Sequence, residues 1–461
     1  MNPFLNPIFL CRVLKSGIVD PNRLRRMNNE DIIKYQNKAL KAIVKYAYTI
    51  PMYKEKYKKI GIHPSDVKEI ADIKKLPFIT KEDFRSNFPN NVISPSFNRK
   101  AAIIAATSGT TGRSLSLYFD LYTVIRSMLG FVRVLKEWDI DWRKTKMSLL
   151  LDLTENSFEN EYIINSIFSS AKPLIPTRNI QIIDILDPPL DIIQQIECFQ
   201  PEVIIGYPFV IIQLAVLKSK GYGKNITPRC IGTSGAFFDM YSRKHVEEVF
   251  NTKVFDIYAA TESGLIAFEC RNGGYHVCSD LVYLEYMKNG SDVSFGEPGS
   301  LVVTKLYGRG TPLIRYTSID DVVTPLNNDC TCGLAGGLIQ RIHGRKSDSV
   351  LLPDGKMAFV SLFENILGES LSEIKVDKIK RIQIVQHKID SIELKILVDK
   401  HLRDVGHPVD KMFSIIKNKL RNRLGPDIKI GIKEVNRFDA KDPYIISKVD
   451  RSKFVEKMYL V

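Results

Sequence analysis

No stretch of this sequence is long and apolar enough to cross a bilayer. The longest apolar run, residues 203–217, is interrupted by Gly206, Pro208 and Gln213, whereas a membrane helix needs about 20 predominantly apolar residues. The N-terminus also lacks the charged region and the small-residue cleavage site of a secretory signal peptide. We therefore expect a cytoplasmic protein without a transmembrane segment. The mildly apolar residues 1–18 are expected to pack locally, with contact to a membrane or a partner as the alternative.

Cysteine is scarce, and charges of one sign are not clustered. Seven cysteines, unevenly spaced over 461 residues, do not form the dense framework of a secreted disulfide-rich domain. The net charge is +14, but Lys and Arg are spread along the chain and form no basic tail. We expect no nucleic-acid partner. The positive charge fits anionic small substrates or simple solvation.

Short apolar runs alternate with helical patterns through the chain. Strands are predicted at residues 147–151, 202–206, 230–234 and 254–258. Helices are predicted at residues 32–48, 209–220 and 239–250. Hairpin strands are predicted at residues 281–287, 300–306 and 312–317. This alternation predicts an α/β fold with a layered core.

The last part of the chain has the pattern of a self-contained α+β lobe. Its expected elements are strands at 381–386, 391–398 and 428–435 and a helix at 408–424. We therefore predict two domains, residues 1–345 and residues 346–461.

A hydroxyl-rich run with two glycines joins two predicted strands. Residues 107–114 read Thr-Ser-Gly-Thr-Thr-Gly-Arg-Ser, between the apolar residues 101–106 and 115–119. Glycine lets a backbone approach a phosphate, to which hydroxyls and free N–H groups then donate. The run is not a Walker loop, since no Gly-Lys-Ser/Thr ending and no direct helix follow. On this segment alone, a phosphate loop and a polar hairpin turn are equally open.

Three further segments carry polar residues at the ends of apolar runs. Residues 258–264 place Glu262 where a carboxylate can hold Mg²⁺, with an exposed loop glutamate as the alternative. Residues 314–321 end in aspartates, and an Asp that closes a strand can accept both hydroxyls of a ribose. At Gly344-Arg345 a guanidinium could reach the same ribose or a phosphate.

Together, in this order, the four segments resemble the adenylate-forming superfamily of acyl-CoA ligases, and most closely the phenylacetate–CoA ligase family. That family includes capsule-locus proteins and the coenzyme-adenylylating synthetases of methanogens. The runs at residues 39–57, 61–64 and 76–83 are also similar to its N-terminal stretch, so the resemblance covers about residues 30 to 450. It implies a large N-terminal adenylate-forming domain of layered β-sheets with helices and a small barrel-like β subdomain, followed by a small mobile α+β C-terminal domain.

The resemblance also implies the chemistry. A carboxylate attacks the α-phosphate of ATP and expels pyrophosphate, and the thiolate of coenzyme A then attacks the acyl-adenylate and expels AMP. ATP, Mg²⁺, CoA and a carboxylic acid are thus the expected ligands. An aryl or arylalkyl acid such as phenylacetate is the default substrate, and a homodimer is the expected oligomer. The aromatic residues of 207–209 and 237–238 are expected to line the acid pocket.

Individual positions match the motifs of the family. The phosphate loop corresponds to Ser108, Gly109, Thr110, Thr111 and Gly112. The resemblance implies that the turn at Gly235 and Ala236 lies on the adenine and that the ring of Tyr258 lies beside it. The remaining matches are Thr261 and Glu262 for phosphate and Mg²⁺, Asp320 for the ribose, Arg345 just before the inter-domain hinge, and Asp348 for the hinge itself.

The sequence departs from the family in two places. The family's Arg-Tyr-Arg-Thr-Gly-Asp is Arg-Tyr-Thr-Ser-Ile-Asp at residues 315–320, which changes the local turn. The catalytic lysine of the family corresponds to Lys441, which lies in Ala-Lys-Asp-Pro at 440–443 instead of following a glycine. Pro443 restricts the backbone there. Lys441 is predicted to be catalytic, with a solvated surface lysine as the alternative.

Two pairs of residues on either side of the hairpin region can form a metal site. Cys270 and His276 form one pair, and Cys330 and Cys332 form the other. Three sulfurs and an imidazole suffice for a closed tetrahedral Zn²⁺ site, which is structural because no coordination position stays open. Some relatives carry matching residues that resemble such a site. Cys278 is a competing ligand, and buried cysteines without metal are the alternative.

Three functions fit this sequence. The first is an ATP-dependent carboxylate–CoA ligase. The second is an adenylating enzyme that passes the acyl or adenylyl group to a sugar, an amine or a deazaflavin hydroxyl. Two features favour it: the altered surroundings of Lys441, and the run at 352–356, which is similar to the capsule-locus branch. The third is a nucleotide-binding protein that has lost turnover.

Overall fold

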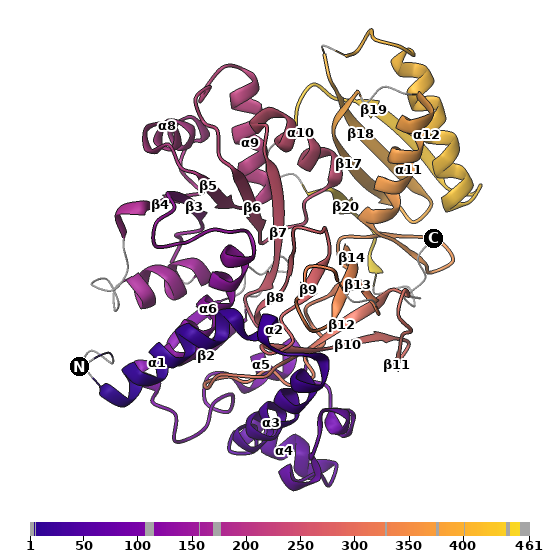
Figure 1. Ribbon diagram of the computed structural model, residues 1–461. Helices are drawn as coiled ribbons and strands as arrows, with labels where there is room; N and C mark the ends of the chain where they lie inside the picture. The colour runs from indigo at the N-terminus through magenta and orange to yellow at the C-terminus, as the bar shows by residue number, and fades with distance from the viewer. Residues whose placement is uncertain are drawn as a thin grey trace.

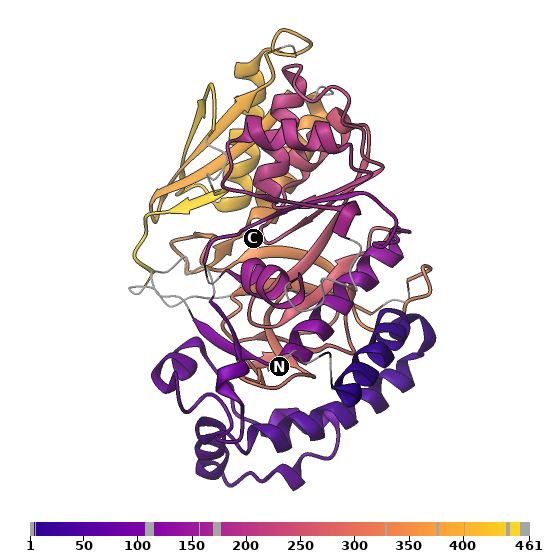
Figure 2. The same ribbon diagram turned by 90° about the vertical axis from the view of Figure 1, so that its left-hand side faces the viewer.

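The computed structural model describes residues 4, 6–106, 115–155, 157–168, 177–327, 330–374, 378–400, 402–438 and 443–451. A central sheet with helices packed on it lies between a group of N-terminal helices and a C-terminal lobe (Figure 1). The lobe and the N-terminal helices lie at opposite ends of the molecule in both views (Figure 2). Within the described residues, no helix combines the length and the apolarity that crossing a membrane requires.

The N-terminal part is helical. Its elements are α1 (Pro7–Val19), η2 (Asp20–Asn22), α2 (Arg23–Arg26), α3 (Asn29–Ala47), α4 (Pro51–Lys59), η3 (Pro64–Asp66), η4 (Ile70–Lys75), α5 (Lys81–Asn87) and η5 (Arg99–Ala101). The helix predicted at residues 32–48 is confirmed as α3. It starts with a capping box, because the side chains of Asn28 and Asp31 each accept the backbone N–H of the other residue.

A 12-stranded sheet forms the centre, in the order β11-β10-β12-β13-β14-β9-β8-β7-β6-β5-β3-β4. Strands β4, β3, β5, β6 and β7 pair in parallel, and antiparallel pairs continue from β7 to β11. The strands are β3 (Met147–Leu151), β4 (Ile180–Asp184), β5 (Val203–Gly206), β6 (Cys230–Ser234), β7 (Lys253–Ala260), β8 (Gly264–Glu269), β9 (Tyr275–Val277), β10 (Val282–Lys288), β11 (Ser291–Asp292), β12 (Gly299–Lys305), β13 (Asp321–Leu326) and β14 (Leu338–Arg345). The predicted α/β class is confirmed, and the β-rich part continues the central sheet.

Helices cover the parallel half of the sheet. They are α6 (Leu121–Glu137), the π-helix η6 (Asn160–Phe168), η8 (Thr177–Asn179), α8 (Pro189–Phe199), α9 (Pro208–Ser219) and α10 (Met240–Phe250). Helices α8, α9 and α10 share one cluster of buried apolar side chains with strands β3 to β7. One face of α6 belongs instead to the main core, which also contains the N-terminal helices and the antiparallel strands. A separate hairpin of β1 (Ile103–Ala106) and β2 (Ser116–Phe119) precedes α6.

The strand predicted at residues 312–317 is wrong. Apart from single bridges of Tyr316 to Ile79 and Val303, this segment is irregular. Arg315 has a φ of 50°, which a strand does not allow. Its buried guanidinium pairs with both oxygens of Glu285, at 3.0 and 2.8 Å. The side chain is therefore held inside the protein, and the backbone bends to place it there.

The C-terminal lobe has its own four-stranded sheet, in the order β19-β18-β17-β20. Its elements are β15 (Val350–Leu351), β16 (Met357–Ala358), α11 (Val360–Ile374), β17 (Ile379–Lys388), β18 (Ser391–Val398), α12 (Val409–Leu424), β19 (Lys429–Glu434) and β20 (Ile445–Ser447). The predicted strands and helix are confirmed, whereas α11 and β20 were not expected. Its apolar cluster contains one buried residue from elsewhere, Tyr241 of α10. The boundary between residues 345 and 346 stays a prediction.

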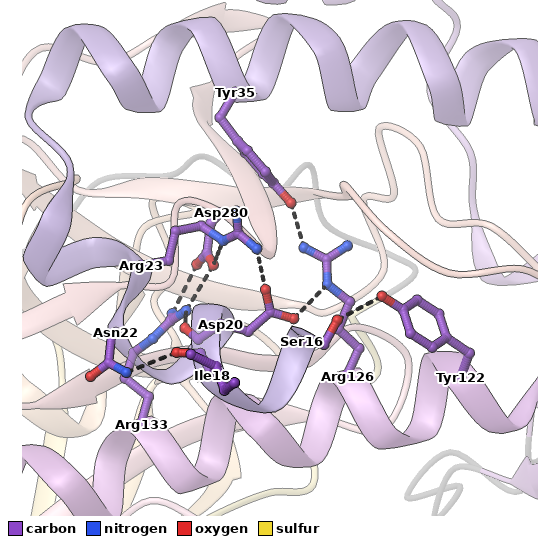
Figure 3. A network of polar contacts seen from close by, with 10 residues as sticks. All are labelled: Ser16, Ile18, Asp20, Asn22, Arg23, Tyr35, Tyr122, Arg126, Arg133 and Asp280. Carbon is purple, nitrogen blue, oxygen red and sulfur yellow. Dashed lines mark hydrogen bonds and ion pairs between the residues drawn. The ribbon is translucent and has the colours of Figure 1, made fainter. Parts of the chain in front are cut away.

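A buried ionic network fastens the N-terminal segment to α6 (Figure 3). Arg133 of α6 donates to both carboxylate oxygens of Asp280, at 2.8 and 2.7 Å, and to the backbone carbonyl of Asp20 at 2.7 Å. Arg126, about two turns before Arg133 on α6, donates to the carboxylate of Asp20 at 3.2 Å. Arg23 pairs with both aspartates. The two carboxylates are 2% exposed or less, so each relies on these arginines.

We expect Asp280→Asn to lower the free energy of unfolding by about 3–5 kcal/mol, because removing one partner leaves the buried charge of Arg133 without compensation. Urea unfolding followed by circular dichroism measures this change. The matched control is Glu30→Gln, which removes the exposed pair of Glu30 with Lys34 and should cost at most about 1 kcal/mol. Equal effects of the two variants would contradict the role given to the network.

Candidate functional site

A large cavity opens at the carboxyl ends of the parallel strands, where α/β sheets bind ligands. Its volume is about 2360 Å³, and both the central sheet and the C-terminal lobe line it. The predicted site residues on its wall are Gly235, Ala236, Tyr258, Thr261, Glu262, Asp320, Arg345 and Asp348. Residues that lie up to 113 positions apart in the sequence (235 to 348) therefore face one space.

Two predicted elements of the site lie outside the described residues. These are the phosphate loop, Ser108, Gly109, Thr110, Thr111 and Gly112, and the lysine Lys441. Their neighbours are described. The strands predicted on either side of the loop are confirmed as the antiparallel pair β1 and β2, and Ala106 and Ser116 line the cavity. Pro443 and Tyr444, which follow Lys441, line it as well.

The turn after β6 depends on glycine. Gly235 has a φ of 83°, and a Cβ at this position would lie 2.5 Å from Cε1 of Tyr207. Only glycine fits such a turn without displacing the ring. The hydroxyl of Tyr207 donates to Oε1 of Glu159 at 2.5 Å, which holds the ring over the turn. Gly235 and Ala236 thus form a flat backbone platform beside an aromatic side chain.

Tyr258 is fixed by an aspartate that we did not predict. At the end of β7, its hydroxyl donates to Oδ2 of Asp321 at 2.5 Å. Burial raises the pKa of Asp321 to about 6, and the guanidinium of Arg345 lies 3.9 Å from its other oxygen. Asp321 therefore links the predicted aromatic residue to the predicted arginine. The sequence signal for this residue was the doublet Asp320-Asp321, from which only the first member was selected.

Asp320 holds the predicted hinge. Its backbone carbonyl accepts the N–H of Lys346 at 2.9 Å, and its Oδ2 accepts the N–H of Ser347 at 3.0 Å. Asp320 itself has a φ of 70°, a conformation that aspartate tolerates better than most residues. The ribose contact expected of Asp320 stays a prediction. The hydrogen bonds nevertheless tie its carboxylate to the segment that joins the two predicted domains.

Glu262 is a buried carboxylate that forms no ion pair with a described basic side chain. It is 9% exposed, and burial raises its pKa. The hydroxyl of Tyr316 donates to its Oε1 at 3.3 Å. The charges of Lys81 and Arg345, which also line the cavity, act on it from further away. Because a buried carboxylate without an ion pair is costly, a divalent cation bound in the cavity suits this position.

The four predicted zinc ligands come together. The ligand atoms of Cys270, His276, Cys330 and Cys332 all lie within 4.8 Å of one another. The sulfurs of Cys270 and Cys330 are 3.7 Å apart, close to the spacing of about 3.8 Å that tetrahedral zinc with bonds of about 2.3 Å imposes. Nε2 of His276 lies 3.1 Å from the sulfur of Cys332. The donor set and its spacing therefore fit a zinc ion.

The surroundings of this cluster separate it from the cavity. Arg25 of α2 donates to the carbonyl of Cys332 at 3.1 Å and pairs with Glu137 of α6. Cys278, the competing ligand, is buried elsewhere, where burial raises the pKa of its thiol to about 12 and Arg133 lies beside it. All seven cysteines are free thiols. None of the four clustered residues lines the cavity, so a metal here would be structural.

Known proteins are similar to this chain over most of its length. The CapK C-terminal domain model matches residues 363–443. The phenylacetate-coenzyme A ligase of Escherichia coli K12 is 26% identical over 344 residues, 71% of this chain and 74% of the relative. Protein CapK of Staphylococcus aureus is 24% identical over 445 residues, 93% of this chain and 91% of the relative.

A solved structure shares the fold along nearly the whole chain. It is 2-hydroxyisobutyryl-CoA ligase in the postadenylation state, with a TM-score of 0.76, 18% identity, and coverage of 94% of this chain and 92% of the other. The same ligase in the thioesterification state gives a TM-score of 0.59. The chain is therefore similar in sequence to phenylacetate-coenzyme A ligases and to protein CapK and shares its fold with a CoA ligase of known structure, in agreement with the resemblance found in the sequence motifs.

Proposed function

We propose that this protein is an ATP-dependent carboxylate–CoA ligase that forms an acyl-adenylate and then an acyl-CoA thioester. One observation carries the proposal. A single cavity brings together the glycine turn at Gly235, the carboxylates Glu262 and Asp320, the guanidinium of Arg345 and an extended apolar wall. A nucleotide needs the polar groups, a hydrophobic acid needs the apolar wall, and adenylation needs the two side by side.

The residues of the polar end have distinct tasks in this proposal. The ring of Tyr258, held by Asp321, lies flat against the adenine on the platform of Gly235 and Ala236. Asp320 accepts the ribose hydroxyls, and Arg345 donates to the ribose or a phosphate. Glu262 would hold Mg²⁺, with Thr261 donating to phosphate oxygens. When bound, the metal neutralises charge on the triphosphate.

The C-terminal lobe supplies the change between the two half-reactions. Gly344 has a φ of 107° and Asp348 follows in a turn closed by a hydrogen bond from its N–H to the carbonyl of Arg345, at 3.1 Å. A short segment with these features suits a hinge. In the proposal, the lobe presents Lys441 to the carboxylate and the α-phosphate during adenylation. It then rotates about Asp348 to admit coenzyme A.

A second function is favoured by one observation. The C-terminal lobe, which would meet the acceptor, matches the CapK C-terminal domain model over residues 363–443. An adenylated acid passed to a sugar, an amine or a deazaflavin hydroxyl is therefore the alternative to thioester formation. The predicted homodimer and cytoplasmic location accompany both alternatives as proposals.

We also propose that Cys270, His276, Cys330 and Cys332 hold a structural Zn²⁺. These residues join β8, β9 and the segment before β14, so the ion would fasten neighbouring strands of the central sheet. Burial lowers the pKa of His276 to about 4, which keeps the imidazole neutral and able to act as a ligand.

One experiment tests the main proposal. Purified protein is incubated with ATP, Mg²⁺ and a panel of aryl, arylalkyl and aliphatic acids, and AMP and thioester are measured with and without coenzyme A. Acid-dependent AMP that rises together with thioester when CoA is added supports the ligase. AMP without thioester favours the second function. Binding of nucleotide without turnover of any acid would leave only a non-catalytic protein.

The first prediction from this proposal concerns Glu262. Glu262→Gln should lower the rate of pyrophosphate release on the order of 10²-fold, because the neutral amide holds Mg²⁺ poorly. The fold should be unchanged in circular dichroism. Glu297→Gln, in an exposed turn, is the control and should keep the wild-type rate. A wild-type rate in Glu262→Gln would show that the metal assignment is wrong.

The second prediction separates the half-reactions. Lys441→Ala should slow adenylation on the order of 10²-fold, as for the loss of one oxyanion donor, and should barely affect thioester formation from a supplied acyl-adenylate. Asp348→Pro removes the N–H that closes the hinge turn and should do the opposite. Asp348→Ala keeps that N–H and serves as the matched control. Normal adenylation by Lys441→Ala would show that Lys441 is not the catalytic lysine and that another basic residue of the lobe has this role.

The third prediction concerns the metal. Purified wild-type protein should contain one zinc per chain in elemental analysis, and Cys332→Ser should lower both the zinc content and the Tm by several degrees. Cys198→Ser, at an exposed cysteine outside the cluster, should change neither. Zinc-free protein with full thermal stability after washing with chelator would refute the site.

A further inference from the structure

The cavity extends far beyond the nucleotide end. At about 2360 Å³ it exceeds the range of about 300–1,000 Å³ that is usual for small-molecule sites. The part described so far lies at the carboxyl ends of β6 and β7. The remainder, here called the apolar arm, runs between α6, β3 and α1.

Helix α6 gives the arm an entirely apolar wall. The residues of α6 that line it are Leu121, Ile125, Met128, Leu129, Phe131, Val132 and Leu135. They span 15 residues, from 121 to 135, which is about 22 Å of helix at 1.5 Å per residue. The polar residues Thr123, Ser127 and Arg133 of the same helix are buried on the opposite side. Of these residues, Met128, Phe131 and Leu135 also pack against the main core. An apolar helix face that lines a cavity indicates a ligand with little polarity.

The floor of the arm is strand β3. Both of its ends, Met147 and Leu151, line the cavity, together with Leu149 and Leu150 between them. Five residues of strand extend about 16 Å at 3.3 Å per residue. The aromatic residues Tyr207, whose ring lies beside Gly235, and Phe209 also line the cavity.

Helix α1 borders the opening of the arm toward solvent. Gly17 lines the cavity beside Leu14 and Ile18, which are 58% and 66% exposed. The helix is held along α6 by the hydrogen bond of 2.8 Å between Ser16 and Tyr122, and by the network of Asp20 with Arg126 and Arg133 (Figure 3). The buried ionic network thus positions the helix that forms the mouth of the arm.

We infer that the acid substrate carries a long hydrophobic tail, which lies in the apolar arm between α6 and β3 and enters past α1. This inference rests on the proposed ligase function and names its substrate class. The carboxylate faces the polar end at Glu262, and the tail extends along the apolar face of α6. Each methylene that enters the arm leaves water, which is worth up to about fourfold in affinity.

The test uses the full-length protein and straight-chain acids from butanoate to hexadecanoate, with phenylacetate as the short reference. We expect kcat/KM for AMP formation to rise at least about tenfold from butanoate to the long acids. Gly17→Phe should reduce this value for hexadecanoate by more than about tenfold and leave phenylacetate within about twofold, since a Cβ at Gly17 meets no atom within 4 Å and the ring can extend into the arm. Cys11→Phe, on the same helix but outside the cavity, should change neither.

A binding measurement without ATP is independent of turnover. Trp142 lines the cavity, whereas Trp138 is stacked on Phe255 at 4.6 Å and does not line it. Hexadecanoate brominated in mid-chain should quench the fluorescence of Trp142, and Trp142→Phe should lose most of that quenching. Turnover of phenylacetate with no quenching and no dependence on chain length would overturn the inference. Quenching without AMP from any acid would instead refute the proposed ligase and leave the arm intact.

Discussion

Several carboxylates are buried at the carboxyl end of the sheet, and their charge limits the site to ligands that bring cations or hydrogen-bond donors. Glu262, Asp321 and Asp348 all face or border the cavity, and burial raises the pKa of each. Arg345 lies 3.9 Å from Asp321, and the charges of Lys81 and Arg345 both act on Glu262. Acidic groups kept in a low-dielectric wall need cations or donors as partners. Magnesium and the hydroxyls of a nucleotide supply both, so the electrostatics and the proposed chemistry agree.

The contact between the sheet and the C-terminal lobe also depends on a buried carboxylate, Glu364. Oε1 of Glu364 in α11 accepts the N–H of Met240 at the start of α10, at 2.8 Å, and its Oε2 lies 3.4 Å from Arg341 of β14. Burial raises the pKa of Glu364 to about 7. Such a contact has a defined geometry but adds little to the stability of the interface, because the cost of removing Glu364 and Arg341 from water offsets part of their electrostatic attraction. A lobe that leaves this position between half-reactions, as proposed above, would need an interface of this kind.

Much of this architecture could be predicted from local patterns. The strands β3, β5 and β7 are largely apolar. The motif residues at the ends of β6 and β7 are brought to one cavity because parallel strands end at the same edge. Helix α11 was missed because Gly368 and three serines lower its intrinsic helix propensity, and packing of Phe363 and Ile366 into the lobe overcomes that cost.

Other features depend on contacts that no local pattern reveals. The bend at Arg315 exists because of Glu285, which lies 30 residues away in the chain. The role of Asp321 depends on the hydroxyl of Tyr258, on another strand. The apolar face of α6 is indistinguishable in sequence from one that packs in a core, and only the spatial arrangement shows that a cavity lies against it. Tertiary contacts therefore decided these points.

The central claim is that this cavity joins a carboxylic acid to AMP. The measurement that tests it most directly is the exchange of radiolabelled pyrophosphate into ATP without coenzyme A, with and without an acid. The account predicts exchange that requires both the acid and Mg²⁺, because the acyl-adenylate forms reversibly before any acceptor binds. Protein that binds ATP at this cavity yet shows no acid-dependent exchange, with aryl and long-chain acids alike, would contradict it.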